Sequence, residues 1–261
     1  MFLCVETSSR VKSFKAGPVR QGENNIYNVT KRRLNLLSLE EGNRSLLPCL
    51  HKKDGQTPLM QAAQAGHLPL VRLLLARGDN VNASDRFGAT ALMRACKHGH
   101  QAVAYLLIAR GANVTAKTKP SGFTPLLMAI HSLEQQDRSE ARLVSRGSPR
   151  LLRMLILKGA DVNARDAFGN SILSYAVIHG RKDAVRLLLA HGANVDSQTR
   201  IGYTALIIAV GYGSLALVHL LLAAGADPAL RTRNGHSALF FARKRKRSEI
   251  VKALVAAGAR E

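Results

Sequence analysis

The amino-acid sequence predicts an all-α solenoid, in which helix-turn-helix units are joined by hairpin-like loops. Three observations lead to this fold class: glycines recur at a fixed period, a residue that can cap a helix follows each glycine of the first series, and short apolar rows with helical spacing lie between them. Because one such unit buries too little apolar surface to fold alone, the units must stack on one another.

The glycines form two parallel series. The first marks the loop tips, with separations of 33, 34, 47, 33 and 33 residues: Gly55, Gly88, Gly122, Gly169, Gly202 and Gly235. The second follows at 23 residues, or 37 in the third unit: Gly78, Gly111, Gly159, Gly192, Gly225 and Gly258. The excess of 14 residues indicates one insertion, within His131 to Arg150. A tolerated surface loop explains this insertion, and an arm for a specific partner is the alternative.

Each unit is predicted to hold two short helices. A Thr or Ser two residues after the loop glycine can accept hydrogen bonds from the first free amides, and Pro58 suits a first helical turn. A glycine nine residues after the cap, as at Gly66, allows the left-handed turn that ends helix one. Helix two carries an apolar stripe such as Val71 to Leu75. In the last unit Lys246 replaces the turn glycine, and we expect a left-handed lysine that costs about 1 kcal/mol.

These residues resemble the ankyrin repeat. Thr57 to Ala62 (TPLMQA) and Thr124 to Ala129 (TPLLMA) are similar to the family's T-P-L-H-x-A signature, and Gly159 to Ala164 (GADVNA) looks like its loop. The likeness implies six repeats in residues 52–261, at about 52–84, 85–118, 119–165 with the insertion, 166–198, 199–231 and 232–261. The histidine of the family's signature is replaced in all six repeats, so we expect mostly apolar packing at this position. The residues there are Met60, Met93, Leu127, Ser174, Ile207 and Phe240.

The segments before the repeats differ from them in composition. Residues 1–30 are polar and without periodicity, which predicts a flexible tail. Residues 31–51 are rich in leucine and predict a degenerate helical cap on the first repeat. Residues 203–226 carry no charged side chain and are long enough to span a bilayer, but the glycines at 211, 213 and 225 identify this stretch as one repeat.

Composition and motifs argue against catalysis. Among the nine histidines, His67 and His100 fall on the Gly-His position of the repeat, which predicts a structural role. Cys96 occupies a small-residue position inside a predicted first helix. The glycines match no phosphate-binding loop, so we expect no enzyme activity, no cofactor and no metal. With three cysteines and no secretory signal, we expect an intracellular, cytoplasmic protein, or a nuclear one if the host is eukaryotic.

The resemblance implies protein binding on a concave surface of loop tips and helix-one ends. On this surface the family's binding positions correspond to Arg86, Phe87, Lys97, His98, Phe123, Phe168, Asn170, His179, Arg200, Ile201, Tyr203, Tyr212, Arg233 and His236. Aromatic residues and arginine anchor many interfaces. The alternative for Phe87 and Phe168 is that they only pack between neighbouring loops.

The net charge of +21 predicts an acidic or mixed-charge protein partner. The chain alone is expected to be monomeric and not to insert into a membrane. Its densest charge is a basic cluster in the last repeat, consisting of Arg243, Lys244, Arg245, Lys246 and Arg247. A solvated end of the solenoid explains this cluster, and the alternative is a nuclear or nucleic-acid-associated adaptor.

Overall fold

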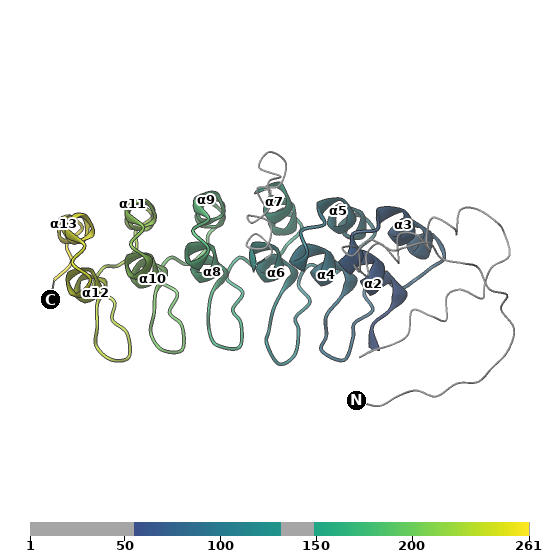
Figure 1. Cartoon of the computed structure of the whole chain (residues 1–261), viewed down its shortest axis with the longest axis horizontal. Coiled ribbons are helices and arrows are strands. Elements are labelled where there is room, and N and C mark those ends of the chain that lie inside the picture. The colour runs from purple at the N-terminus through teal and green to yellow at the C-terminus, as the bar shows by residue number, and fades with distance from the viewer. Residues whose placement is uncertain (1–54, 132–148, 261) are drawn as a thin grey trace, which may run out of the picture. The chain divides into compact units, whose positions relative to one another are not determined.

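The structure, a computed structural model, describes residues 55–131 and 149–260. Within these ranges it has twelve helices in six helix-turn-helix pairs and no strand, so the predicted all-α repeat fold is confirmed (Figure 1). Three of the connecting loops close with a single antiparallel bridge: Ser84 with Thr90, Arg165 with Ser171, and Arg231 with Ser237. The predicted tail, the predicted cap and the inserted segment (residues 132–148) lie outside the described residues.

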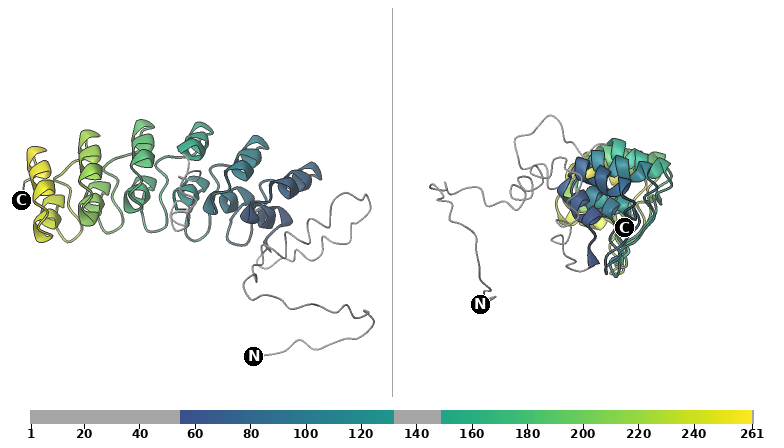
Figure 2. Two further views of the ribbon diagram at one scale, coloured as in Figure 1. Left: turned by 45° about the horizontal axis from the view of Figure 1, so that its top comes forward. Right: turned by 90° about the vertical axis from the view of Figure 1, so that its right-hand side faces the viewer.

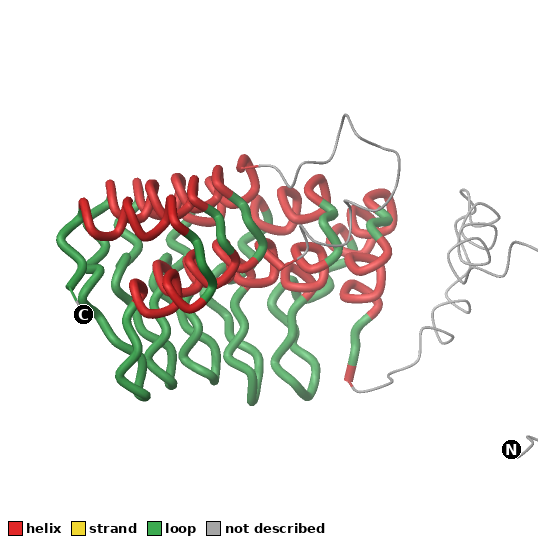
Figure 3. Tube along the Cα trace, turned by 60° about the vertical axis from the view of Figure 1, so that its left-hand side comes forward, coloured by secondary structure: helices red, strands yellow, loops and turns green. Residues whose placement is uncertain are grey.

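The first helices of the six pairs are α2 (Pro58–Ala65), α4 (Ala91–Lys97), α6 (Pro125–His131), α8 (Ile172–Ile178), α10 (Ala205–Tyr212) and α12 (Ala238–Lys244). The second helices are α3 (Leu68–Ala76), α5 (Gln101–Ala109), α7 (Pro149–Leu157), α9 (Lys182–Ala190), α11 (Leu215–Ala223) and α13 (Ser248–Ala256). Each first helix packs on the next, and the second helices pack on one another from α3 to α9 and again from α11 to α13, which gives two layers of helices (Figure 2). The connecting loops all extend on the same side of these layers (Figure 3).

The predicted cap residues begin the first helices. The Thr57 hydroxyl accepts a hydrogen bond from the Met60 amide at 3.2 Å, and the same bond forms at Thr90, Thr124, Ser171, Thr204 and Ser237. The residue at the third helical position is buried in the first five repeats, as expected from its mostly apolar character. Phe240 differs, because its side chain is 38% exposed and stacks on His236. It lies in the last described repeat, so no further described repeat covers it.

The core is continuous along the solenoid. Every second helix contributes one equivalent leucine that is at most 2% exposed: Leu74, Leu107, Leu155, Leu188, Leu221 and Leu254. Neighbouring repeats cover these side chains, which is why a single repeat could not retain its fold. The uncharged stretch 203–226 contains α10 and α11, and no helix in the described part of the chain is long and apolar enough to cross a membrane.

The inter-helix turn of the last repeat contains a left-handed lysine, as predicted. Lys246 has a φ of 53° and is the only residue other than glycine with a positive φ in the described ranges. We expect Lys246→Gly to raise the free energy of unfolding by about 1 kcal/mol, because glycine adopts this conformation without steric cost. Urea denaturation measures the change. Lys246→Ala removes the same charge but keeps the Cβ, so an equal gain in that variant would contradict the backbone explanation.

Candidate functional site

The tips of neighbouring loops are joined by hydrogen bonds. In each case the backbone amide of one loop donates to the carbonyl at the tip of the preceding loop: Lys119 to Phe87 at 2.7 Å, Ala167 to Ser121 at 2.9 Å, Arg200 to Phe168 at 3.2 Å, and Arg233 to Ile201 at 3.1 Å. The five loops between the repeats therefore form one connected row. We call this row, together with the exposed side of the first helices, the loop face. Its geometry is largely set before anything binds, which lowers the entropic cost of binding.

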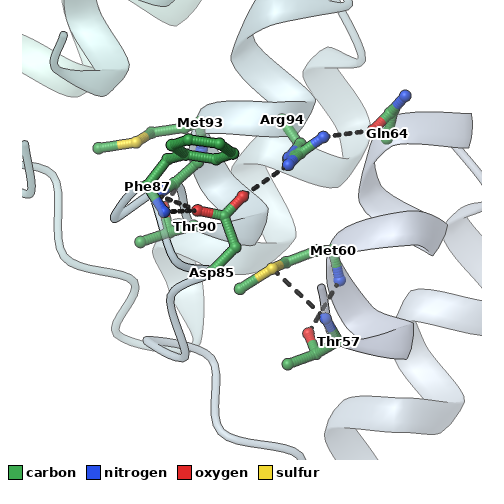
Figure 4. A network of polar contacts seen from close by, with 9 residues as sticks. Thr57, Met60, Gln64, Asp85, Phe87, Thr90, Met93 and Arg94 are labelled. Atoms are coloured by element: carbon green, nitrogen blue, oxygen red, sulfur yellow. Dashed lines mark hydrogen bonds and ion pairs between the residues drawn. The ribbon is translucent and has the colours of Figure 1, made fainter. Parts of the chain in front are cut away.

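A buried carboxylate organises the first of these loops. Asp85 accepts hydrogen bonds from the amides of Phe87 and Ala89, both at 2.9 Å, through Oδ1. Its Oδ2 lies 2.7 Å from Nη2 of Arg94, and Nη1 of that arginine donates to the Gln64 side chain at 2.8 Å (Figure 4). This network joins α2, the loop and α4, so the position of the first loop tip depends on a buried ion pair.

Asp166 has the same place in the third loop. Its carboxylate accepts hydrogen bonds from the amides of Phe168 and Asn170, the Asn170 side chain and the Tyr175 hydroxyl. Burial opposes ionisation of Asp166, but these hydrogen bonds outweigh it, so the pKa of the carboxyl lies below its ordinary value. Burial, followed by the hydrogen bond to Asp166 and its charge, raises the pKa of Tyr175 to about 12. At neutral pH the pair is therefore an ionised carboxylate and a neutral phenol.

The role of these carboxylates in holding the loops was not predicted from the sequence. Their signal is an oxygen-bearing side chain three residues before the loop glycine, or four in the second loop, and it recurs with the repeat: Asp85, Thr118, Asp166, Thr199 and Thr232. Each of these side chains accepts a hydrogen bond from the amide that follows the glycine. A search for the period among polar residues, in addition to glycines, would have found them.

The predicted site residues divide into two groups by exposure. The large apolar side chains of Phe87, Phe168, Ile201 and Tyr212 are 45%, 67%, 61% and 62% exposed. The rings of Phe87 and Phe168 are thus not buried between neighbouring loops, whereas the alternative interpretation of the sequence was that they only pack there. The basic residues Arg86, Lys97, Arg200 and Arg233 are also exposed.

The second group is half-buried and packs against other side chains of the same repeat or of the neighbouring one. Its members are His98, Phe123, Asn170, His179, Tyr203 and His236. Phe123 contacts the ring of Tyr175, and Tyr203 contacts the ring of Phe241, with ring centroids 6.2 and 5.8 Å apart. Burial, followed by the nearby charges of His100, Lys97 and Arg94, lowers the pKa of His98. Substitutions in this group would change stability and binding together.

The basic cluster is partly engaged in contacts within the protein. Arg245 donates to the carbonyl of Gly211 at 2.7 Å, and Arg247 donates to the same oxygen at 3.5 Å. This carbonyl lies in the last turn of α10, where a helix has unpaired acceptors. Lys244 lies 5.7 Å from the centre of the Phe240 ring. Arg245 and Arg247 therefore hold the last described repeat against the one before it.

The residues considered for chemistry also have structural contacts. Nδ1 of His67 accepts a hydrogen bond from the Leu70 amide at 3.1 Å, at the start of α3. The His100 ring lies 2.9 Å from the Gln64 carbonyl oxygen and covers the turn at Gly66. Among the described residues, no group of three or more potential ligands could hold a metal ion.

Cys96 is fully buried in α4, and burial raises the pKa of its thiol to about 12. Because the thiolate is the reactive form, we expect this thiol to resist iodoacetamide at neutral pH in the folded chain. The measurement is mass spectrometry of a variant whose other cysteines, Cys4 and Cys49, are serines. Labelling should become fast only in denaturant, and fast labelling of the folded protein would contradict the buried position.

Comparison with known proteins agrees with this geometry. The family model for ankyrin repeats (3 copies) matches residues 31–118, 79–137 and 141–232, and its first match includes the segment 31–51. An ankyrin repeat domain from Acinetobacter baumannii is 34% identical, with a TM-score of 0.67 over 78% of this chain and 98% of that one.

A second similar chain comes from a complex of a predatory endopeptidase of Bdellovibrio bacteriovorus with an immunity protein. It is 26% identical, with a TM-score of 0.65 over 77% of this chain and 98% of that one. No curated protein matches this sequence. The domain from Acinetobacter baumannii and the family model therefore agree on one repeat family.

Proposed function

Because this chain belongs to the ankyrin repeat family, we propose that it is a protein-binding scaffold that uses its loop face and performs no catalysis. Ankyrin repeats generally mediate protein-protein interaction. One observation on this chain carries the proposal: exposed apolar side chains lie in a row on loop tips that are joined by hydrogen bonds. These side chains are Phe87, Phe168 and Ile201. Exposed apolar groups on a rigid frame favour burial by a partner.

The partner is acidic or of mixed charge. Arg86, Arg200 and Arg233 are exposed at the loop tips, whereas Asp85 and Asp166 are buried in hydrogen bonds at the base of their loops. The charge that a partner meets at these tips is therefore positive, and complementary charge accelerates association and improves specificity. The similar chain from the endopeptidase complex is consistent with a role in protein assembly.

The absence of catalysis is proposed from the state of the reactive side chains. Cys96 is buried with a raised pKa, and the rings of His67 and His100 make contacts at inter-helix turns. A nucleophile or general base has to reach a substrate. These three groups serve the packing of the repeats instead.

The test is affinity capture with crosslinking from a lysate of the source organism, with the full chain as bait. A triple variant, Phe87→Ser with Phe168→Ser and Ile201→Ser, should lose the proteins captured by the wild type and keep its melting temperature within a few degrees. Tyr203 is left unchanged, because its contact with Phe241 belongs to the core. If the triple variant captures the same proteins at the same yield as the wild type, the binding surface does not include the loop tips.

The matched control removes equally exposed apolar side chains from the opposite layer. Leu73, Leu157 and Val255 lie on second helices and are 46%, 70% and 51% exposed. Replacing all three with serine should leave capture unchanged. If this control variant loses the same proteins as the loop variant, the effect comes from general surface hydrophobicity, and the proposal fails.

A further inference from the structure

A hollow of about 470 Å³ lies on the loop face between the third and fourth of the described inter-repeat loops. Its volume is in the range of ligand sites, about 300–1,000 Å³. Its walls are mainly apolar, and their principal residues are Phe168, Ile201, Tyr203, Ile208, Asn170 and Arg200. Because Phe168 and Ile201 are both more than half exposed, much of the apolar wall is accessible to a partner.

The hollow is held in shape by hydrogen bonds around it. The Arg200 amide donates to the Phe168 carbonyl at 3.2 Å and joins the two loops at their tips. On one side the Asn170 side chain donates to Asp166 at 2.9 Å, and on the other the Tyr203 amide donates to the Thr199 hydroxyl at 3.0 Å. A site whose walls are fixed in this way binds at a low cost in conformational entropy.

The charge around the hollow is positive. Arg200 lines it, and Arg233 is exposed at the tip of the next loop. None of the lining residues is acidic. The carboxylate of Asp166, which binds the lining residue Asn170, is buried and accepts four hydrogen bonds from within the protein. The hollow therefore combines an apolar floor with a basic rim.

We propose that this hollow binds an acidic peptide segment of the partner, with one leucine, isoleucine or phenylalanine side chain inserted against Phe168 and Ile201. A carboxylate next to that side chain pairs with Arg200 at the rim. The apolar side chain provides most of the affinity, because it is removed from water, and the carboxylate selects acidic over basic segments. This inference rests on the proposed function and names the part of the loop face that recognises the partner.

The probe is a library of random linear peptides displayed on phage and selected against the full chain. We expect the enriched peptides to carry an aliphatic or phenylalanine residue beside Asp or Glu. One enriched peptide is then synthesised and titrated by fluorescence anisotropy. Ile201→Asp should abolish its binding, and Arg200→Glu should weaken it about tenfold, which corresponds to about 1.4 kcal/mol.

Lys182→Glu is the matched control, because it makes the same charge change at an exposed position on α9, a second helix. This variant should bind the peptide as the wild type does. Thermal melting of all variants checks that each retains its fold. A loss of binding only in Ile201→Asp and Arg200→Glu supports the hollow as the site.

Three results would overturn the inference: no enriched peptides, enriched peptides without acidic residues, or enriched peptides whose affinity is the same in Ile201→Asp. The capture experiment separates this failure from failure of the proposed function. If the triple loop variant loses its partners while the Ile201→Asp variant keeps them, the scaffold function stands and the hollow is not its recognition site.

Discussion

Replacing Asp85 with alanine is expected to lower the free energy of unfolding by about 3 kcal/mol. The change removes the acceptor of two backbone amides and leaves Arg94 without its carboxylate, and the side chain of Arg94 is only 19% exposed. The lost network joins the first repeat to the second, since Arg94 also binds Gln64 of α2. Circular dichroism during urea denaturation measures the loss.

The control for this prediction is Asp183→Ala. Asp183 pairs with Arg186 at 3.6 Å on the surface of α9, where both side chains are more than two-thirds exposed. Exposed pairs contribute little, so this change should cost less than about 0.5 kcal/mol. If the two substitutions have equal effects, the buried network does not stabilise the first loop as described.

The network also predicts how the Asp85→Ala variant unfolds. Stability in a solenoid is close to a sum of repeat and interface terms, so weakening one interface favours separate unfolding of the repeat beyond it. We expect hydrogen exchange to accelerate first in α2 and α3. Uniform acceleration along all six repeats would show that the solenoid unfolds as one unit despite the change.

The second large effect is expected for Gly202→Ala. This substitution should lower the free energy of unfolding by about 3 kcal/mol, because alanine is strained in a left-handed conformation and its Cβ would clash with the next loop. Gly202 has a φ of 81°, and an added Cβ would lie 2.7 Å from the Arg233 amide nitrogen and 2.8 Å from Thr232 Cα. Both are backbone atoms, so no side chain can turn aside to relieve the contact. The Arg233 to Ile201 hydrogen bond would have to break. Thermal and urea unfolding measure the cost.

Gly235→Ala is the matched control at the same position of the next loop. Gly235 has a φ of 77°, but an added Cβ there would meet nothing within 4 Å. This substitution should cost only the backbone strain, about 1 kcal/mol. The difference of about 2 kcal/mol between the two variants isolates the contact between loops. Equal costs would contradict the close stacking on which the rigidity of the loop face depends.

The sequence by itself determined the repeat fold, because the residues that define the repeat act on the backbone of their own helix or turn. A capping Thr or Ser acts within the first turn of its own helix, and a left-handed turn needs glycine whatever surrounds it. Lys246 takes the place of a glycine at one of these turns, and its positive φ followed from its position in the repeat alone. The apolar stripes of the second helices likewise required burial between neighbouring repeats.

Only the tertiary structure decided which candidate residues are accessible. Phe168 and Tyr203 occupy the positions before and after the loop glycine of their repeats, yet Phe168 is 67% exposed whereas Tyr203 packs on Phe241. The partners of Asp85 and Asp166 also differ, since the same helix position is Arg94 in one repeat and Tyr175 in the other. The burial of Tyr203 depends on a side chain about one repeat away, which is placed by the stacking of the repeats. The pairing of Asp85 and Asp166 depends on how each loop folds back on the helix that follows it.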